Sequence, residues 1–390
     1  MGRGGAGARG GAVIKTTDVA IIGGGVIGCA TAYALASAGL RVLLLERDQI
    51  ACEASGEAAG MLAPQAEASA AGPFLALGLR SRDLFLALTA ALREETGLDV
   101  EYRQDGTLCP CLDEGEEAEA RSRFAWQRGQ GLPVEWWGAE EVRKAEPGIS
   151  PAVRGALFIP GDHQVTSGTF TRALALAAAR RGAEIWEGAP VTGFVRDRKR
   201  IVGVKNLDRT VSAGRYVLAA GPWSAQVAYL LGLPVPVQPV KGQLCMAGLL
   251  QGEPRHVIYS HLAYLVPRPG GEVVLGTTVE FAGFDKRVTV GGLRGILAGA
   301  QALYPALAAA PMLRAWAGLR PYTSDELPLL GPVPEVEEVV VATGHHRNGI
   351  LLAPVTAQLL RELIVDGRTS IPLAPFRVDR ELISTAPEAR

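Results

Sequence analysis

The stretch that decides the fold is Asp18–Glu46, which reads DVAIIGGGVIGCATAYALASAGLRVLLLE. Its short apolar run at 19–22 predicts a parallel strand that is buried on both faces. Gly23, Gly25 and Gly28 follow with the G-x-G-x-x-G spacing. This spacing predicts a tight turn, a close backbone approach to a pyrophosphate and close packing of helix on strand. The helix that begins there points its N-terminal amides and positive dipole end at phosphate groups.

Glu46 completes the pattern, because it ends the second strand of the unit and offers a carboxylate to a pair of ribose hydroxyls. A G-x-G-x-x-G match alone is weak, since 48 of the 390 residues are glycine. The strand, helix, second strand and acidic residue together make the match specific. The stretch therefore predicts an adenine-dinucleotide site.

Composition agrees with a cytoplasmic enzyme of a size that allows two domains. The chain carries 39 basic and 40 acidic residues, so no broad electrostatic field indicates nucleic acid or anionic lipid. The uncharged run at 19–40 is long enough to cross a membrane and also resembles a secretory signal. Its glycines and its continuation into a second strand favour the nucleotide-binding interpretation. Residues 1–16, which begin MGRGGAGARGGA, are predicted to be disordered.

The cysteines and histidines do not predict a metal site. The five cysteines include no C-x-x-C and are expected to be reduced and mostly buried. A disulfide or metal role for Cys109 and Cys111 stays open as a minor alternative. His345 and His346 are adjacent, so their side chains point in different directions. The dense basic cluster at 196–200, RDRKR, is expected to form a solvated hairpin turn.

Features outside the first unit favour FAD over NAD. The second strand is followed by a loop of small residues at 53–64, EASGEAAGMLAP, whose backbone can approach a bulky planar ligand closely. A buried strand ending in Ala-Ala-Gly lies at 215–224, and a strand, glycine turn and helix start follow at 339–354. Beyond the glycine-rich first dozen residues, the chain holds no second G-x-G-x-x-G for NAD(P)H, so electrons are expected to come from the substrate. The late helix can stabilise negative charge on a reduced flavin.

The secondary-structure pattern predicts helices at 75–95, 169–181 and 293–303. Strands are predicted at 100–112, 132–137, 201–205, 211–219, 235–246, 257–266 and 272–278. Neither repeats nor a long flexible linker divide the chain, so two domains are expected to be intertwined.

Three segments, ASGEAAGMLAPQ at 54–65, WAGLRP at 316–321 and GHHRNGILLAP at 344–354, resemble the glycine oxidase family, ThiO, of the D-amino-acid-oxidase-like flavoenzymes. The likeness extends from about residue 17 to 380. It implies an α/β (mixed α+β) fold in which a Rossmann-like FAD-binding domain is interleaved with an antiparallel-sheet substrate domain. The expected FAD-binding parts are 17–95, 161–233 and 315–390, and the expected substrate-binding parts are 96–160 and 234–314.

The resemblance also implies the functional residues. Arg320, Arg347 and Tyr264 match positions that bind the substrate carboxylate, which a planar guanidinium can hold through two parallel hydrogen bonds. For each arginine the alternative is an ordinary salt bridge to Asp325 or Glu326, or a hydrogen bond at the edge of the core. Met61 matches a methionine that packs near flavin and substrate, and Val279 replaces a bulkier side chain. The expected FAD contacts are Gly23, Gly25, Val26, Ile27, Gly28, Glu46, Arg47, Ala54, Ser55, Ala59, Gly60, Met61, Val191, Gly221, His345, Arg347, Asn348, Gly349, Ile350 and Leu351.

The implied activity is the oxidation of glycine and other small amines by dioxygen, which supplies an imine for the thiazole of thiamine. The FAD is expected to be non-covalent, because no cysteine follows Cys245 to form a late cysteinyl link. By resemblance the protein is expected to be a homotetramer with no membrane or nucleic-acid partner. The alternatives are a D-amino-acid dehydrogenase, a sarcosine or D-proline oxidase, and, in another class, a non-catalytic or tRNA-modifying flavoprotein module.

Overall fold

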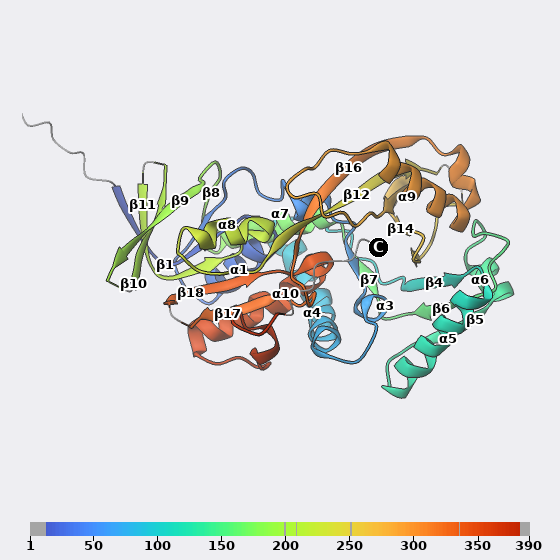
Figure 1. The fold of residues 1–390 in the computed structure, drawn as a ribbon, viewed down its shortest axis with the longest axis horizontal. Helices are drawn as coiled ribbons and strands as arrows, with labels where there is room; N and C mark the ends of the chain where they lie inside the picture. The colour runs from blue at the N-terminus through green and yellow to red at the C-terminus, as the bar shows by residue number, and fades with distance from the viewer. Residues whose placement is uncertain (1–12, 199, 208, 250–251, 335, 383–390) are drawn as a thin grey trace, which may run out of the picture.

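The fold consists of two large sheets arranged along the long axis of the molecule (Figure 1). The structure is a computed structural model, and it describes residues 13–198, 200–207, 209–249, 252–334 and 336–382. Chain segments that are far apart in sequence contribute to each sheet, so the two halves are intertwined. The predicted mixed α/β architecture is confirmed.

The first sheet is built around parallel strands and carries the glycine turn. β1 (Val13–Ile22) lies in its centre, between β11 (Arg209–Leu218) and β2 (Val42–Leu45), and both pairings are parallel. The strand order is β17-β18-β11-β1-β2-β8, and an antiparallel hairpin of β9 and β10 pairs with β11. The further strands of this sheet are β8 (Glu184–Trp186), β9 (Val191–Asp197), β10 (Arg200–Asn206), β17 (Leu329–Val333) and β18 (Val336–Thr343).

Both faces of this sheet are buried, as the continuous apolar run predicts. Ile21 and Leu44 belong to the core on one face, whereas Ile22, Leu43 and Leu45 belong to the core on the other. Four helices that pack on one another cover the first face: α1 (Val26–Ser37), α4 (Pro73–Thr96), α7 (Ser167–Arg180) and α10 (Gly349–Arg361). The short helix α8 (Ser224–Tyr229) contributes to the second core.

The second sheet is mainly antiparallel and has the order β16-β12-β15-β14-β13-β4-β6-β5. Only the β13–β4 pair among its described pairings is parallel. Its strands are β4 (Thr107–Cys111), β5 (Glu135–Gly138), β6 (Gly155–Ile159), β12 (Gln238–Gly248), β13 (Val257–Tyr259), β14 (Tyr264–Pro267), β15 (Glu272–Gly276) and β16 (Met312–Tyr322). The helices α5 (Glu114–Gly129), α6 (Ala139–Ala145) and α9 (Val290–Leu303) accompany it (Figure 1).

Short elements connect the two halves near the predicted small-residue loop. They are α2 (Ala54–Glu57), β3 (Met61–Leu62), α3 (Pro64–Glu67) and β7 (His163–Gln164), with β3 and β7 forming a two-stranded sheet. Two 3₁₀ turns follow β11 and β18, namely η1 (Gly221–Trp223) and η4 (His346–Asn348).

Three expectations need correction. The run at 257–266, predicted as one strand, forms two strands, β13 and β14, which pair as a hairpin. Residues 13–16, predicted to be disordered, extend β1, because the long strand β11 offers pairing partners from Arg209 onward; residues 1–12 lie outside the described residues. The predicted boundary at 314/315 cuts β16, which pairs with β12 in the second sheet, so this boundary moves to the end of β16. The division into FAD-binding and substrate-binding domains stays a proposal.

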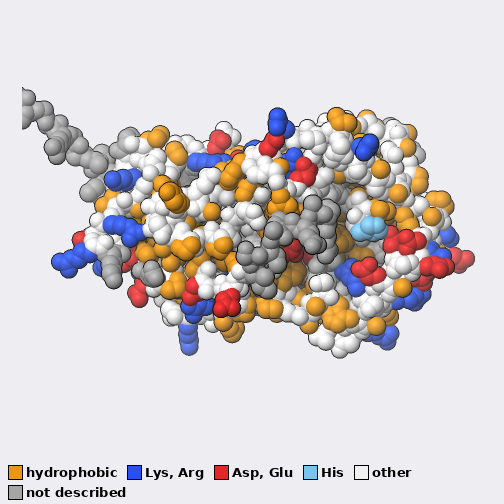
Figure 2. Space-filling view, viewed as in Figure 1, with side chains coloured by type: hydrophobic (Ala, Val, Ile, Leu, Met, Phe, Trp, Pro, Cys, Tyr) orange, Lys and Arg blue, Asp and Glu red, His pale blue; other side chains and the backbone are white. Residues whose placement is uncertain are grey.

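One helical segment in the described part of the chain, His346–Asp366 (21 residues), is long and apolar enough to cross a membrane by length and composition. It comprises η4, α10 and the π-helical segment Glu362–Asp366 that follows α10. Within its most apolar stretch, 56% is buried inside the structure. Core helices pass the same test, so this segment is weak evidence for a membrane span. On the face of the molecule shown in Figure 2, Lys, Arg, Asp and Glu side chains are interspersed with hydrophobic ones. The run at 19–40 is the β1–α1 unit of the first sheet.

Candidate active site

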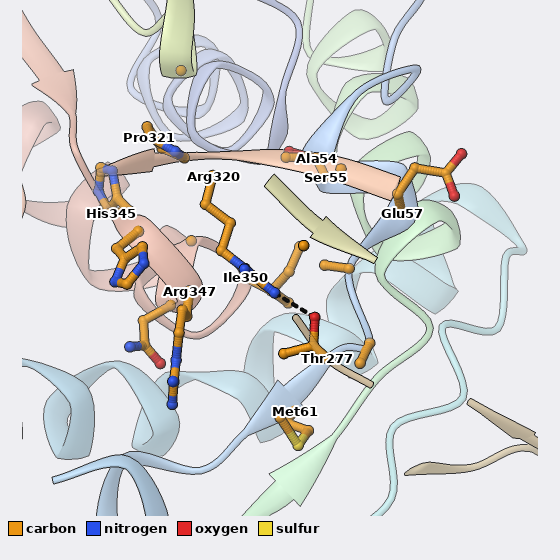
Figure 3. A pocket seen from close by; sticks show the side chains of 18 of the residues that line it. Ala54, Ser55, Glu57, Met61, Thr277, Arg320, Pro321, His345, Arg347 and Ile350 are labelled. Atoms are coloured by element: carbon orange, nitrogen blue, oxygen red, sulfur yellow. Dashed lines mark hydrogen bonds between the residues drawn. The ribbon is translucent and has the colours of Figure 1, made fainter. Parts of the chain in front are cut away.

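Residues from both sheets line a cavity of about 1070 Å³. The glycine turn and the end of β2 line it from the first sheet, while Tyr264 and Arg320 line it from the second. Segments 54–61 and 345–350 complete its wall (Figure 3). Its size exceeds that of ordinary small-molecule pockets and is sufficient for a dinucleotide together with a small substrate.

The three glycines of the turn have different neighbours. A Cβ on Gly23, whose φ is +114°, would lie 2.4 Å from the Ala219 carbonyl oxygen, and one on Gly28 would lie 1.9 Å from the Gly23 carbonyl oxygen. These two glycines are therefore required by protein packing. A Cβ on Gly25 would contact only the Ser55 hydroxyl, at 3.1 Å, and Gly25 lines the cavity. The space beside Gly25 is thus left for a ligand.

The N-terminus of α1 at this point suits an anion. Gly25 is the N-cap, it provides no capping side chain, and the first turn holds no acidic residue. The Val26 amide donates to the Ser55 hydroxyl over 2.9 Å. The positive end of the helix dipole therefore faces the cavity without a compensating carboxylate, which fits a pyrophosphate.

Glu46 and Arg47 directly follow β2 and line the cavity. The buried Glu46 carboxylate accepts hydrogen bonds from the amides of Gly24 (2.6 Å) and Asp48 (2.9 Å). These bonds fix the carboxylate at the cavity wall, and a carboxylate retains further lone pairs for hydroxyl donors. The Arg47 guanidinium lies 3.7 Å from the Trp223 ring centroid and donates to Glu53 over 3.1 Å.

Arg320 reaches the cavity from β16 and crosses β12 at Gly242, where a Cβ would lie 2.1 Å from its Nη2 atom. Nη2 donates to the Thr277 hydroxyl over 2.6 Å and Nη1 donates to the Thr278 carbonyl over 3.0 Å (Figure 3). Burial lowers the pKa of Arg320, but a guanidinium stays protonated in proteins. Among the described residues no carboxylate pairs with Arg320.

The predicted alternative partners of Arg320 are engaged elsewhere. Asp325 pairs with Arg380 over 2.7 Å, and Glu326 lies 3.8 Å from the His346 ring nitrogen Nδ1. The positive charge of Arg320 is therefore available to an anionic ligand in the cavity.

Tyr264 lies beside Arg320 on β14, with 9% of its surface exposed. Its ring covers Gly276 of β15, where a Cβ would lie 2.3 Å from the ring carbon Cζ. Burial raises the pKa of the Tyr264 hydroxyl, although Arg320 and a hydrogen bond with Thr277 act in the opposite direction. The hydroxyl is therefore protonated at neutral pH and can donate a hydrogen bond next to the Arg320 guanidinium.

Arg347 has a different environment, in η4. Its Nη2 atom donates to the Glu67 carboxylate and, over 2.7 Å, to the Tyr259 hydroxyl. The negative charge of Glu67 raises the pKa of Arg347 further above its ordinary value. In Figure 3 the guanidinium groups of Arg320 and Arg347 point in different directions. The partner of Arg347 is thus Glu67, and neither Asp325 nor Glu326.

Met61 and the two histidines complete this end of the cavity. Met61 is partly buried on β3 and packs with the cluster that contains Ala59 and Tyr264. His345 is buried, with Nε2 3.0 Å from the Thr356 hydroxyl oxygen. Burial lowers the pKa of His345 and of His346 to about 3, so both rings are neutral at physiological pH.

The structure brings nearly all the predicted site residues to the cavity. Gly28 and Leu351 are the exceptions. Gly28 packs against Gly23, and Leu351 is fully buried in the helical core with its carbonyl accepting from the Ser81 hydroxyl over 2.6 Å. The predicted residues that line the cavity are Gly23, Gly25, Val26, Ile27, Glu46, Arg47, Ala54, Ser55, Ala59, Gly60, Met61, Val191, Gly221, Tyr264, Arg320, His345, Arg347, Asn348, Gly349 and Ile350.

Four residues that contact the predicted arginines were missed by the sequence analysis: Thr277, Thr278, Tyr259 and Glu67. Glycines inside strands were a usable signal, because they mark places where another group approaches the backbone closely. Gly276 precedes Thr277 and lies under Tyr264, and Gly242 lies under Arg320. Glu67 had no comparable signal, since its contact with Arg347 joins segments 280 residues apart.

Two cysteines of β4, Cys109 and Cys111, also line the cavity. All five cysteines are free, and Cys109 and Cys111 are buried on β4. In the part of the chain that the structure describes, no group of three or more His, Cys, Asp or Glu residues could hold a metal ion.

Comparison with known proteins gives a consistent result. The family model described as FAD dependent oxidoreductase matches residues 18–363. Glycine oxidase from Geobacillus kaustophilus is 38% identical over 94% of this chain and 97% of its own length, and a crystal structure of that enzyme superimposes with a TM-score of 0.91. The bifunctional protein ThiO/ThiG of a Nostoc species is 38% identical over 94% of this chain, which covers 55% of that protein. The chain therefore belongs to the FAD dependent oxidoreductase family, and within it resembles the glycine oxidases along nearly its whole length.

Proposed function

We propose that this protein is an FAD-dependent glycine oxidase that converts glycine, dioxygen and water to glyoxylate, ammonia and hydrogen peroxide. One observation carries the proposal: Arg320, whose guanidinium has no carboxylate partner among the described residues, lies with the Tyr264 hydroxyl at one end of a cavity whose other end is the glycine turn. This arrangement joins a site for a small carboxylate to a site for a dinucleotide.

The residues around the glycine turn would hold the cofactor. Gly25 and the N-terminus of α1 suit the pyrophosphate, and Glu46 suits the ribose hydroxyls. Asn348 and Gly349 stand at the start of α10, whose first turn holds no acidic residue, so its dipole stabilises negative charge in the cavity. When bound, FAD supplies a two-electron acceptor for the oxidation of the amine.

The chain's own part in the reaction is to bind and orient the substrate. Arg320 and Tyr264 hold the carboxylate, while Met61 and the small residues at 59–60 form an apolar wall beside the amine end. A charged hydrogen bond of this kind contributes about 1.5–3 kcal/mol. Arg347 is already paired with Glu67, so it contributes positive potential near the substrate carboxylate but is not expected to bind it as directly as Arg320 does.

Neither His345 nor His346 provides a strong base for the substrate amine. His345 and His346 have a pKa of about 3 and are therefore poor proton acceptors at neutral pH. The productive substrate is accordingly the form whose amine is already neutral, because the nitrogen lone pair is needed to form the imine.

The wider role follows from the relatives. A ThiO/ThiG protein joins a ThiO part to a second enzyme, which supports delivery of the imine to thiamine thiazole synthesis. We further propose that the protein is cytoplasmic and homo-oligomeric, with a tetramer as the expected form. The FAD is proposed to be non-covalent, since Cys245, the last cysteine, is buried on β12.

Oxygen consumption with glycine, sarcosine, D-alanine and D-proline tests the proposal. Glycine or sarcosine should be turned over with stoichiometric hydrogen peroxide, and cofactor released by acid should remain in the supernatant as FAD. Val279 lines the cavity, is 48% exposed and is smaller than the side chain that the resembling family carries at this position. The panel therefore also reports the largest amine that the cavity accepts. Turnover only with an artificial electron acceptor would instead identify a dehydrogenase.

A further inference from the structure

The segment that follows β15 holds the Arg320 guanidinium in place. Thr277 accepts from Nη2 over 2.6 Å and itself donates to the Gln243 carbonyl over 3.0 Å. The Thr278 carbonyl accepts from Nη1 over 3.0 Å. An arginine side chain has many rotamers, so a bidentate contact with a carboxylate needs such anchors to preset its direction.

Thr278 is in turn fixed by a group of polar side chains behind the cavity. The Thr278 hydroxyl accepts a hydrogen bond from the backbone N–H of Gln243 over 2.9 Å and donates one to the Glu280 carboxylate over 2.5 Å. The buried Gln243 side chain also donates to the same Glu280 oxygen over 2.7 Å. Both threonines that contact Arg320 are therefore tied to Gln243, and one of them also to Glu280.

Glu280 is balanced by a buried lysine. Lys241 Nζ lies 2.7 Å from the other Glu280 oxygen, and only 3% of the lysine side chain is exposed. The two backbones also exchange hydrogen bonds of 2.8 and 2.9 Å. Burial raises the pKa of Glu280, but its hydrogen bonds with Lys241, Thr278 and Gln243 outweigh burial and lower the pKa overall. The Glu280 carboxylate is thus ionised at neutral pH.

A partly buried ion pair, here with 3% of the lysine and 30% of the glutamate side chain exposed, is weak evidence for a purely stabilising role, because desolvation of the charges offsets much of their attraction. Glu280 is also connected to the substrate-binding arginine through a single residue, Thr278. We propose that Glu280, neutralised by Lys241, is a positioning residue: it fixes Thr278 and Gln243, and through Thr277 sets the direction of the Arg320 guanidinium for the substrate carboxylate. The inference rests on the proposed function, in which Arg320 binds that carboxylate.

Steady-state kinetics of Glu280→Gln with glycine test the proposal. The neutral side chain keeps the shape but weakens the anchor, so KM should rise about tenfold while kcat stays within about threefold. Acetate, a carboxylate without an amine, should bind the holoenzyme about tenfold more weakly in a titration of the flavin absorption spectrum. Asp285→Asn is the matched control, because Asp285 lies on the same segment and, in the described part of the chain, its carboxylate forms its ion pair and side-chain hydrogen bonds with the exposed Arg287.

A double-mutant cycle separates positioning from general destabilisation. In an Arg320→Ala background, Glu280→Gln should cause no further loss of kcat/KM for glycine. An equal loss in both backgrounds, or an unchanged KM in folded, FAD-loaded Glu280→Gln protein, would overturn the proposal.

Two further variants cover the case in which Glu280→Gln does not fold. Thr277→Val should raise KM like Glu280→Gln, and Thr277→Ser should restore it, since only the serine retains the hydroxyl that accepts from Arg320. Equal KM values for the two variants would also overturn the proposal. A failure of the proposed function can be told apart from a failure of this positioning proposal. In the former case the wild-type protein would not oxidise glycine, or the Arg320→Ala variant would turn over glycine as fast as the wild type.

Discussion

The two ends of the cavity are built in opposite ways. The glycine turn joins β1 to α1 within a few consecutive residues, and its local geometry comes from the positive φ of Gly23 and from the packing of Gly28 against the Gly23 carbonyl. The substrate end is assembled from separate strands, with Arg320 on β16, Tyr264 on β14 and Thr277 after β15. Local chemistry therefore specifies where the cofactor binds, whereas the pairing of distant strands specifies where the substrate binds.

Gly25→Val tests the cofactor end and should have the largest effect. The valine side chain would occupy the space left for the pyrophosphate, so the purified protein should be colourless and inactive. No backbone atom lies within 4 Å of a Cβ at this position, so the protein should still fold, as measured by circular dichroism. Gly295→Val, at an exposed glycine of α9 with open space around it, is the control. A yellow Gly25→Val protein would refute the assignment of the turn.

Arg320→Ala tests the substrate end. Losing the charged partner of the carboxylate should lower kcat/KM for glycine by about 2–4 kcal/mol, or roughly 30- to 1,000-fold, with FAD retained. Arg314→Ala removes an exposed arginine from the same strand and should leave the kinetics unchanged. If Arg320→Ala lost its flavin instead, the two ends of the cavity would not be separable.

Arg347→Ala asks whether a paired arginine contributes as much as an unpaired one. Because Glu67 already compensates Arg347, the loss should be smaller, about 1–2 kcal/mol or roughly 5- to 30-fold in kcat/KM. Part of this loss comes from the Glu67 carboxylate, whose side chain is only 9% exposed and would be left unpaired near the substrate. The double variant Glu67→Gln/Arg347→Ala should therefore be more active than Arg347→Ala. A loss equal to that of Arg320→Ala, without relief by Glu67→Gln, would make Arg347 a direct ligand of the carboxylate.

Tyr264→Phe should have the smallest effect, about tenfold in kcat/KM for one lost hydrogen bond. The pH profile of both proteins should rise toward alkaline pH with deprotonation of the substrate amine. The neighbouring histidines do not titrate there, because their pKa of about 3 keeps them neutral throughout the neutral and alkaline range. A loss of several thousandfold with a flattened profile would identify Tyr264 as a general base.

The sequence by itself determined the cofactor half of this protein. The G-x-G-x-x-G turn, the buried strands on both sides of it and the terminal Glu46 are consecutive, and their periodicity and backbone requirements can be interpreted without knowledge of any distant contact. Resemblance, rather than periodicity, pointed to Arg320, Arg347 and Tyr264.

Only the tertiary structure decided how those residues are used. Within the residues it describes, it gave Arg320 threonine partners and no carboxylate, paired Arg347 with Glu67, and placed Leu351 in the core instead of the cavity. It also brought Thr277 and the Lys241–Glu280 pair behind Arg320. These contacts join side chains across strands and across the two sheets, and their energy depends on burial and on strand register. Neither burial nor register is encoded in the spacing of neighbouring residues, so the sequence alone could not provide them.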